Sequence, residues 1–383
     1  MLSPFDDYPV HQTARPIAHP VDGNLNRYDR YFFNGYDPDG DVYFAAAMGL
    51  YPNRRVIDAA LSVVTAGEQI SVFASGRAPA DPGVTEVGPF RLTVEEPMRR
   101  LRFDLGDNDH GLAASLVFGA RTAAVEEPHF HIVDPPRTVM DYTRFTQWGE
   151  WSGTLDVDGR TLELDRSRYR GTRDRSWGVR RVGEPEGGAP SSRPPQFHWL
   201  WAPLNFDDVC VHVDTQQDRV GQAWHSFGAV TPVLAGPAEP VVGPESRIDP
   251  MADARIDVEW QPGTRWMREA RMRLTPRPDH TGIVTDETVI DLEPLRRFQM
   301  KGLGYFHPTR AHGLWQGELS VTGDRWRLDG DDATDPARVE NFHVQTLVRA
   351  TMGDRVGTGI LEQLVLGPHE PSGFTGITDL AGS

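Results

Sequence analysis

The residues best suited to acid–base chemistry lie in a charged stretch at positions 170–180, with the sequence Arg-Gly-Thr-Arg-Asp-Arg-Ser-Trp-Gly-Val-Arg. If this stretch is a strand, Arg173, Arg175 and Trp177 share one face while Asp174 lies on the other. An enclosed Asp174 could protonate an alkene or stabilise a developing cation. The flanking arginines favour the ionised carboxylate and argue against a raised pKa. The structural alternative is an arginine–Asp174 pair that closes a barrel, with Trp177 packed beneath an arginine.

Two histidines form a second candidate pair for proton transfer. His307 and His312 lie five residues apart across a proline, in a predicted turn. A neutral histidine beside a pocket can carry a proton, whereas a histidine bonded to a loop carbonyl is structural. Glu318 follows closely, but the predicted hairpin register places it opposite Arg327, where a cross-strand ion pair accounts for it. We therefore rank Glu318 behind the histidines as a catalytic candidate.

Metal binding is a weaker interpretation, resting on His129 and His131. They share one strand face, with acidic residues within three positions on either side. This spacing can hold zinc or iron when a third ligand comes from elsewhere in the chain. No third ligand is recognisable, so we favour an exposed strand end and expect no metal. The sequence also lacks a phosphate-binding glycine loop and a nucleophile elbow, and we expect no cofactor.

Aromatic residues are numerous enough to line a pocket for an apolar molecule and to stabilise a cation within it. Large aromatic side chains also fill barrel cores, and most of the ten tryptophans fit that alternative. The candidate ligand-binding residues are Arg173, Arg175, Trp177, Trp148, His198, Trp201, Tyr305 and Trp315.

Composition excludes several classes of partner. A formal net charge of −16 over 383 residues argues against binding to nucleic acid or to an anionic membrane. The single cysteine, Cys210, excludes an intramolecular disulfide framework. The first residues lack the apolar core of a signal peptide, and the longest apolar run, residues 43–51, is too short for a membrane helix. We expect a soluble, cytoplasmic protein with no membrane insertion.

The elements that must position these residues are predicted to be strands. Short alternating or β-branched segments recur at roughly ten-residue spacing between turn-forming residues, which is typical of an all-β chain. Residues 31–33 and 42–44 are predicted to form a hairpin. Further strands are predicted around 63–64, 70–74, 90–94, 101–105, 113–120, 138–142, 198–201, 209–213, 221–226, 256–260, 271–275, 288–292 and 346–350.

An internal repeat indicates two related halves. Residues 149–164 and 313–328 align without gaps, with seven of sixteen positions identical where chance gives roughly one. Both copies carry a two-residue turn sequence, Asp158-Gly159 and Thr322-Gly323, so both are predicted to be tight hairpins. Residues 173–179 align weakly with residues 338–344, without the aspartate.

We therefore predict two tandem β-barrel domains. The N-terminal barrel spans residues 1–182, residues 183–195 form a linker rich in proline and glycine, and the C-terminal barrel spans residues 196–383.

Two motifs resemble a known family: the Arg-Asp-Arg-x-Trp core at 173–177, and the segment 302–318 with its Gly-Tyr-Phe-His-Pro and His-Gly-x-Trp-x-Gly-Glu sequences. They are similar to the carotenoid 1,2-hydratase-like and AttH-like group of lipocalin-like proteins, which also includes fungal Diels–Alderase-type cyclases. The second motif is most similar to uncharacterised actinobacterial members. The resemblance spans residues 25–366 and implies two lipocalin-like barrels with an apolar pocket in one barrel or between them.

The resulting hypothesis is a cofactor-independent lyase or isomerase, a hydratase, dehydratase or cyclase, that acts on a terpenoid-, carotenoid- or polyketide-like molecule. Asp174 and a histidine from 305–315 would transfer the proton. The alternatives are a non-catalytic carrier of a hydrophobic ligand and, less favoured, a metal enzyme built on His129 and His131. The oligomeric state is left open, with a homodimer among the options.

Overall fold

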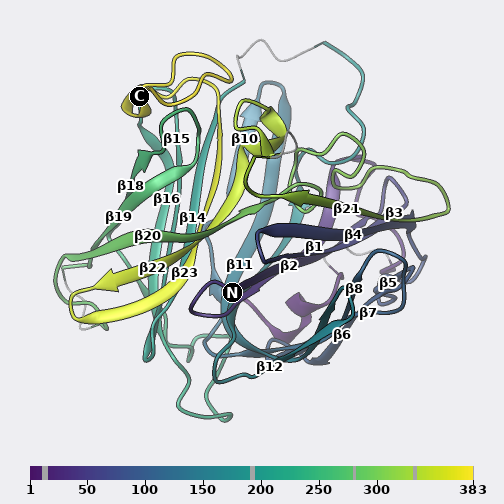
Figure 1. Cartoon of the computed structure of the whole chain (residues 1–383), viewed down its shortest axis with the longest axis horizontal. Coiled ribbons are helices and arrows are strands. Elements are labelled where there is room, and N and C mark those ends of the chain that lie inside the picture. Colours follow the sequence, from purple (N-terminus) through teal and green to yellow (C-terminus); the bar gives the residue numbers. More distant parts are fainter. Residues whose placement is uncertain (11–15, 190–194, 279–281, 331–333, 383) are drawn as a thin grey trace.

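The computed structural model describes residues 1–10, 16–189, 195–278, 282–330 and 334–382. Within them, regular structure consists of β-strands and three single turns of 3-10 helix, which confirms the predicted all-β class. The short helical turns are η1 (Pro4–Asp7), η3 (Val339–Asn341) and η4 (Glu370–Ser372). None of the helices in the described residues is long and apolar enough to cross a membrane. The strands form two antiparallel sheets that lie side by side (Figure 1).

The first sheet has 14 strands and curls into a nearly closed barrel. Its path runs β21 (Leu319–Arg327), β4 (Glu68–Arg77), β3 (Val56–Thr65), β2 (Val42–Tyr51), β1 (Arg27–Tyr36), β13 (Arg170–Val179), β11 (Arg137–Val157), β8 (Leu112–Ala120), β7 (Arg100–Leu105), β6 (Phe90–Glu96), β5 (Glu86–Val87). Three further strands pair with β11: β9 (Val125–Glu126), β10 (Phe130–Asp134) and β12 (Arg160–Leu164). The end strand β5 contacts β3 and β4, which brings the two edges of the sheet together.

The second sheet has nine strands and forms a half-barrel. Its path runs β17 (Asp249–Pro250), β16 (Ala223–Pro232), β15 (Val209–Gln217), β14 (Phe197–Asn205), β23 (Arg355–Leu366), β22 (His343–Met352), β20 (Thr288–Gln299), β19 (Met267–Thr275), β18 (Asp253–Trp260). In both sheets a late strand returns to pair with the first strand, β13 with β1 and β23 with β14. The predicted hairpin of residues 31–33 and 42–44 is the pair β1–β2, and the other predicted strands fall within observed strands, apart from the first two residues of 221–226.

Burial explains why β1 and β2 do not alternate between apolar and polar residues. One face of each strand packs into the barrel core, and the other packs against the second sheet. Both faces are therefore removed from water, which favours a continuous apolar run. The small side chains of Ala45 and Ala47 in β2 lie on the face toward the second sheet, together with Trp199 and Trp201 of β14.

The two copies of the sequence repeat fold differently. The first copy is the predicted hairpin, in which β11 and β12 pair Gly153 with Leu164, and its turn residues Asp158 and Gly159 both have positive φ. The prediction for the second copy is wrong, because residues 319–327 form one straight strand, β21, that pairs with β4 throughout. A tight hairpin of this kind needs positive φ at both turn residues, which the β-branched Thr322 disfavours.

Residues 338–344 are also not the counterpart of β13, since they contain η3 and only the start of β22. By its pairing with β14, the strand that corresponds to β13 is β23. The domain boundaries 1–182 and 196–383 stay a prediction, although β21 of the second range pairs within the first sheet. Of the predicted linker 183–195, residues 190–194 lie outside the described residues.

Candidate functional site

The two sheets meet in an interface, here called the seam, between β1, β2, β11 and β13 on one side and β14, β15, β22 and β23 on the other. The paired residues of β14 and β23 mark successive positions along the length of the seam. Phe197 pairs with Leu366 at one end, Trp201 with Glu362 in the middle and Asn205 with Thr358 at the other end. On β13 the corresponding order runs from the residues beyond Val179, through Asp174, to Arg170.

Asp174 lies at the middle level, beside Phe32 of β1 and Thr146 of β11. Among the described residues, its carboxylate takes part in no hydrogen bond or ion pair, and the side chain remains partly accessible. Burial raises the pKa of Asp174 to about 6, against the opposing effects of Arg144 and Arg180. The carboxyl group therefore lies in the seam without being sealed from solvent, and it retains a proton more readily than an exposed aspartate.

The arginines on either side of Asp174 in sequence do not face it. Arg173 points into the first barrel and forms an ion pair with Asp7, and Arg175 does the same with Asp29. The expected lowering of the Asp174 pKa by these arginines is therefore wrong, as is a barrel-closing pair between them. Trp177 shares the arginine face, where its ring lies against Phe145 and not toward Asp174.

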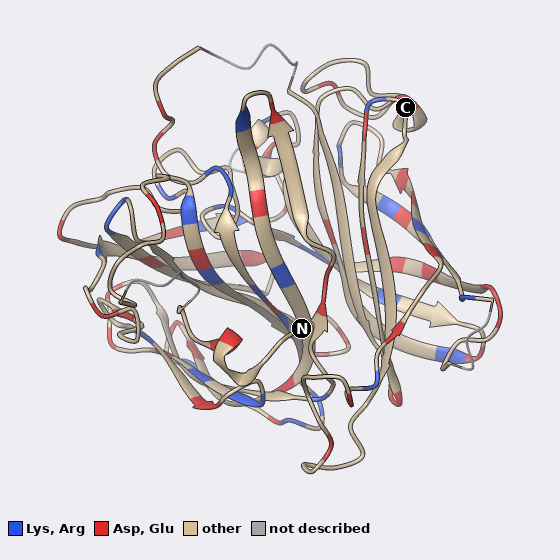
Figure 2. Cartoon of the chain, turned by 180° about the vertical axis from the view of Figure 1, so that it is seen from behind, with Lys and Arg blue, Asp and Glu red and all other residues tan. Residues whose placement is uncertain are grey.

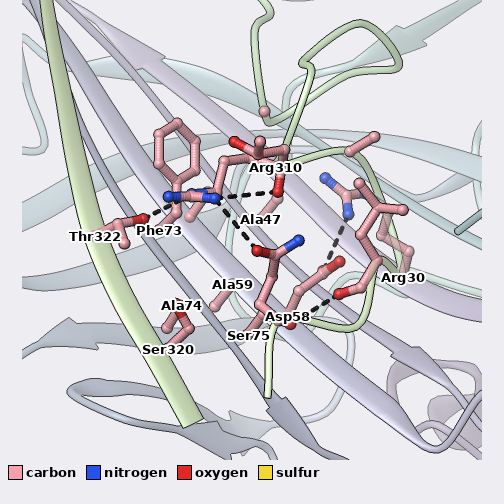
Figure 3. A pocket seen from close by; sticks show the side chains of 16 residues that line it. Arg30, Ala47, Asp58, Ala59, Phe73, Ala74, Ser75, Arg310, Ser320 and Thr322 are labelled. Atoms are coloured by element: carbon pink, nitrogen blue, oxygen red, sulfur yellow. Dashed lines mark hydrogen bonds and ion pairs between the residues drawn. The ribbon is translucent and has the colours of Figure 1, made fainter.

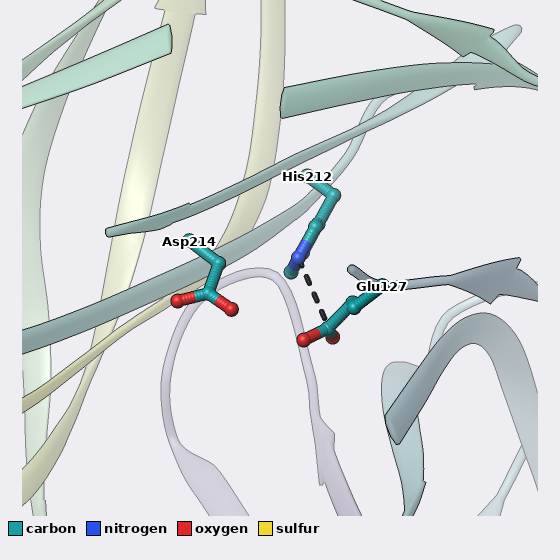
Figure 4. Close-up of side chains that lie close together, drawn as sticks. All are labelled: Glu127, His212 and Asp214. Carbon is teal, nitrogen blue, oxygen red and sulfur yellow. Dashed lines mark ion pairs between the residues drawn. The ribbon is translucent and has the colours of Figure 1, made fainter. Parts of the chain in front are cut away.

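Arg144 is the centre of a buried charged cluster next to Asp174 (Figure 4 shows its acidic and histidine members). One of its guanidinium nitrogens lies 2.5 Å from carboxylate oxygens of both Glu127 and Asp214. Asp214 also contacts the His225 ring at 3.2 Å. Burial raises the pKa of Glu127; for Asp214, burial is outweighed by Arg144 and the His225 hydrogen bond, and its pKa is lowered.

The same cluster is the one group of side chains in the described part of the chain whose spacing suits a metal ion. Glu127, His212 and Asp214 each offer a ligand atom, and within the described residues neither ring nitrogen of the buried His212 has a hydrogen bond, although its Nε2 lies 3.5 Å from a Glu127 oxygen. However, the Arg144 guanidinium lies between the two carboxylates and supplies the positive charge that they require. Burial lowers the pKa of His212 to about 3, so the ring adds no charge. The residues present therefore do not fit a resident cation.

A second polar group faces Asp174 from the other sheet. His343 contacts Glu362 at 2.6 Å, and Gln345 donates to the same carboxylate while accepting from the Tyr43 hydroxyl. The ring of Tyr305 stacks on that of His343, with 5.8 Å between centroids. Tyr43 comes from the first sheet, and His343, Gln345 and Glu362 come from the second, so polar groups from both sheets converge on the seam.

An apolar cavity of about 380 Å³ opens at the Phe197 end of the seam. Its lining is Met140, Arg181, Val182, Gly183, Phe197, Tyr305, Phe306, Ala311, His312, Leu364 and Leu366. Arg180 donates a 2.8 Å hydrogen bond to the Tyr305 hydroxyl, and its guanidinium stacks over the ring of Tyr28. The positively charged side chain of Arg180 therefore lies between this cavity and the middle of the seam.

His312 and Tyr305 are the predicted residues that reach this cavity. His312 is buried, and its Nε2 is 2.7 Å from the carbonyl oxygen of Leu303, while its Nδ1 has no hydrogen-bond partner among the described residues. Burial lowers the pKa of His312 well below its usual value, and Arg30 and Arg180 act in the same direction. A neutral His312 at the cavity wall is compatible with binding, and it also fits the structural alternative of a loop-anchoring histidine.

The other candidates from the 302–318 segment do not reach the cavity. His307 pairs with Asp324 at 2.9 Å, and Glu318 forms an exposed ion pair with Arg77, not with Arg327. Trp315 is 44% exposed and stacks with Arg77. These contacts anchor the segment to β4 and β21. Beneath it lies a second cavity of only about 20 Å³, beside Arg30, Asp58 and Arg310 (Figure 3), which has room for about one water molecule.

The remaining predicted ligand-binding residues divide between the seam and the cores. Trp148 and Trp201 are fully buried on the seam, where their rings lie about 6 Å from that of His212. His198 points to the opposite face of β14, where it stacks on His369 at 3.9 Å, so it does not reach the seam, and its predicted ligand-binding role stays a prediction. His129 and His131 are about half exposed and both contact Asp141.

Sequence reasoning missed Glu127, Arg144, Asp214, Arg180 and Glu362. A signal was present for one of them, because Asp214 follows His212 at a two-residue spacing in a largely apolar strand. A charged residue on a buried strand face must find a partner. The partners come from distant strands, which the sequence alone does not identify.

Comparison with known protein families places this chain in one of them. A model described as a family of unknown function (DUF8625) matches residues 2–375. The chain belongs to this family. A search of curated protein sequences finds no match.

Two solved structures have a similar fold. Kievitone hydratase from Nectria haematococca is 11% identical, with 88% of each chain covered and a TM-score of 0.52. A putative AttH from Nitrosomonas europaea is 12% identical, with 88% of this chain and 92% of the other covered and a TM-score of 0.52. The predicted likeness to the hydratase-like and AttH-like fold is confirmed. The expected similarity to actinobacterial members stays a prediction.

Proposed function

We propose that the protein is a cofactor-independent lyase or isomerase, a hydratase, dehydratase or cyclase, that takes an apolar terpenoid-, carotenoid- or polyketide-like molecule into the seam. The observation that carries this proposal is the carboxyl group of Asp174, which is partly accessible in the seam, has no hydrogen-bond or ion-pair partner among the described residues, and has a pKa raised by burial to about 6. Buried carboxylates with a structural role are normally paired.

Asp174 would act as the general acid. With a pKa of about 6, roughly a tenth of the molecules carry its proton at neutral pH, and this proton can pass to an alkene carbon. Aromatic rings of the seam would stabilise the resulting carbocation, and Trp199 and Trp201 already hold a cation in this way, because the Arg144 guanidinium lies 5.2 and 5.8 Å from their centroids. Water then adds with loss of a proton, or the cation cyclises and loses a proton; either proton returns to Asp174, so the acid is regenerated.

The similar structures support this proposal through the printed activity of one of them. Kievitone hydratase is named as a hydratase, and its chain has the same fold as this one. At 11% identity the likeness concerns the fold, so the reaction and substrate rest on the seam geometry. A cytoplasmic location, a homodimer and the identity of the substrate stay predictions.

The alternative is a non-catalytic carrier of a hydrophobic ligand. The observation in its favour is the apolar lining of the 380 Å³ cavity, where Met140, Phe197 and Leu366 would suit a passive binding site. In a carrier, the convergence of Asp174, Glu362 and His343 at the seam would serve stability alone.

Deuterium incorporation separates these functions. The protein and its Asp174→Asn variant would be incubated in D₂O with a panel of unsaturated terpenoids and polyketides, and the products analysed by mass spectrometry. We expect the native protein to convert one class of substrate either into a hydrated or cyclised product with one carbon-bound deuterium, or, in a dehydration, into a product that has lost water, and we expect the variant to give neither product. Unaltered ligand bound equally by both proteins would support the carrier and contradict the acid role.

A further inference from the structure

A second, basic cleft lies at the far end of the seam from the apolar cavity. It has a volume of about 430 Å³ and lies between the turn before β13 and the ends of β14, β22 and β23. Its polar lining includes four arginines and two hydroxyl residues: Arg121, Arg168, Arg170, Arg349, Ser167 and Thr358. Acidic and basic residues are interspersed over the rest of the chain (Figure 2), and a concentration of arginines is unusual in a chain with a net charge of −16.

Arg121 is the most buried of the four and has only neutral acceptors among the described residues. Its guanidinium donates to Asn205 Oδ1 at 2.7 Å and to the carbonyl oxygens of Phe206 and Asp207 at 3.3 and 3.2 Å. The side chain is 8% exposed, so it gains little from water. A buried guanidinium held by neutral oxygens leaves positive charge at the cleft wall.

Arg170 and Arg349 have only distant carboxylates. Arg170 lies 3.7 Å from Glu150, and Arg349 lies 3.8 Å from Glu293. Burial lowers the pKa of Arg170, and the neighbouring Arg121 acts in the same direction. Arg168 is better neutralised, at 2.7 Å from a carboxylate. The guanidinium groups of Arg121, Arg170 and Arg349 are therefore incompletely neutralised, and they make the electrostatic potential in the cleft positive.

We propose that this cleft binds a small organic anion that carries a phosphate or carboxylate group. The planar guanidinium fork matches both oxyanions, and bonds between ionised partners are stronger than neutral ones. The hydroxyl groups of Ser167 and Thr358 supply neutral donors beside the arginines. The one acidic residue in the lining, Asp207, limits but does not cancel the positive charge.

The cleft is separate from the apolar cavity and does not depend on the proposed reaction. On β13, Arg170 lies four residues from Asp174, and on β14, Asn205 lies four residues from Trp201. The buried rings of Tyr36 and Tyr43 stack between the cleft and the middle of the seam, and the Tyr36 hydroxyl accepts a hydrogen bond from Asn205. A ligand can therefore occupy the cleft without entering the seam.

Calorimetric titration at constant ionic strength tests this proposal, with inorganic phosphate, pyrophosphate and citrate as separate probes. We expect saturable binding of at least one probe, and its preference for pyrophosphate or citrate identifies the ligand as a phosphate or a carboxylate. Arg349→Gln removes one lining charge from an exposed side chain and should weaken binding about tenfold. Asp207→Asn removes the lining carboxylate and should strengthen binding.

The matched control is Arg271→Gln, which makes the same charge change on the exposed face of β19, away from the cleft. This variant should bind each probe as the native protein does. Absence of saturable binding at millimolar probe, or an equal effect of Arg349→Gln and Arg271→Gln, overturns the proposal. Because Arg349 is half exposed and only loosely paired, Arg349→Gln is expected to fold, and thermal unfolding verifies this.

Discussion

Replacement of Asp174 by asparagine should stabilise the protein at neutral pH. An asparagine resembles the protonated carboxyl group, so it avoids the free-energy cost of an ionised group in an enclosed site. The folded-state pKa of about 6, compared with the ordinary value of 3.8, corresponds to roughly 3 kcal/mol at about 1.4 kcal/mol per pKa unit. The native protein should therefore be about 3 kcal/mol less stable than the variant at pH values above the folded-state pKa.

The sign of this difference depends on pH in a defined way. Because the folded state holds its proton up to a higher pH than the unfolded state, ionisation of Asp174 destabilises the fold as pH rises from about 4 to about 6. The stabilisation in Asp174→Asn should therefore be largest near pH 7.5, about half as large near pH 5, and absent below about pH 4.

Urea unfolding of both proteins over this pH range measures the difference in free energy. Asp107→Asn is the matched control, because it makes the same replacement at an exposed aspartate outside the seam. A variant that is less stable than the native protein at neutral pH would refute the reasoning. Such a result would indicate that Asp174 has a stabilising partner and a structural role.

Three further predictions concern the surrounding charges. Arg144→Met leaves two buried carboxylates without their cation, so it should reduce the free energy of unfolding by about 3–5 kcal/mol in urea titrations and raise the Asp174 pKa further above 6. His198, whose pKa burial lowers to about 3, stays neutral in the folded state, so stability falls as pH drops below 6.5; the native protein should lose about 2 kcal/mol more than His198→Phe between pH 7 and pH 5. Glu318→Gln breaks only an exposed ion pair and should leave both the melting temperature and deuterium incorporation unchanged, whereas lost incorporation would restore Glu318 as a catalytic candidate.

The sequence predicted the fold class and strand positions because these depend on local periodicity. It also assigned the two faces of residues 170–180, with Asp174 opposite Arg173 and Arg175. The pKa argument failed because it used proximity in sequence, while neighbours on a strand point in opposite directions. The positive charges that act on Asp174 belong to Arg144 and Arg180. Arg144 is close to Asp174 because β11 pairs with β13, and the sequence alone does not reveal that pairing.

The repeat shows a different limit of sequence reasoning. Identity between residues 149–164 and 313–328 extends over strand and turn alike, yet only the first copy folds back on itself. Asp158 and Gly159 adopt positive φ, whereas Thr322 continues an edge strand on β4. A single change in the turn, from Asp158 to Thr322 at equivalent positions, therefore outweighs the similarity of the flanking residues, and the register argument for Glu318 built on that similarity failed with it.

The contrast between Asp174 and the other buried carboxylates of the seam is the strongest argument for chemistry there. Glu127 and Asp214 share Arg144, and Glu362 is bonded to His343 and Gln345. Such pairing is what burial requires of a carboxylate with a structural role. Asp174 is less buried than these three and has no partner among the described residues, yet burial still raises its pKa to about 6, so its ionised form lowers stability. A carrier has no use for such a group, whereas an acid catalyst needs a carboxyl that retains its proton near neutral pH.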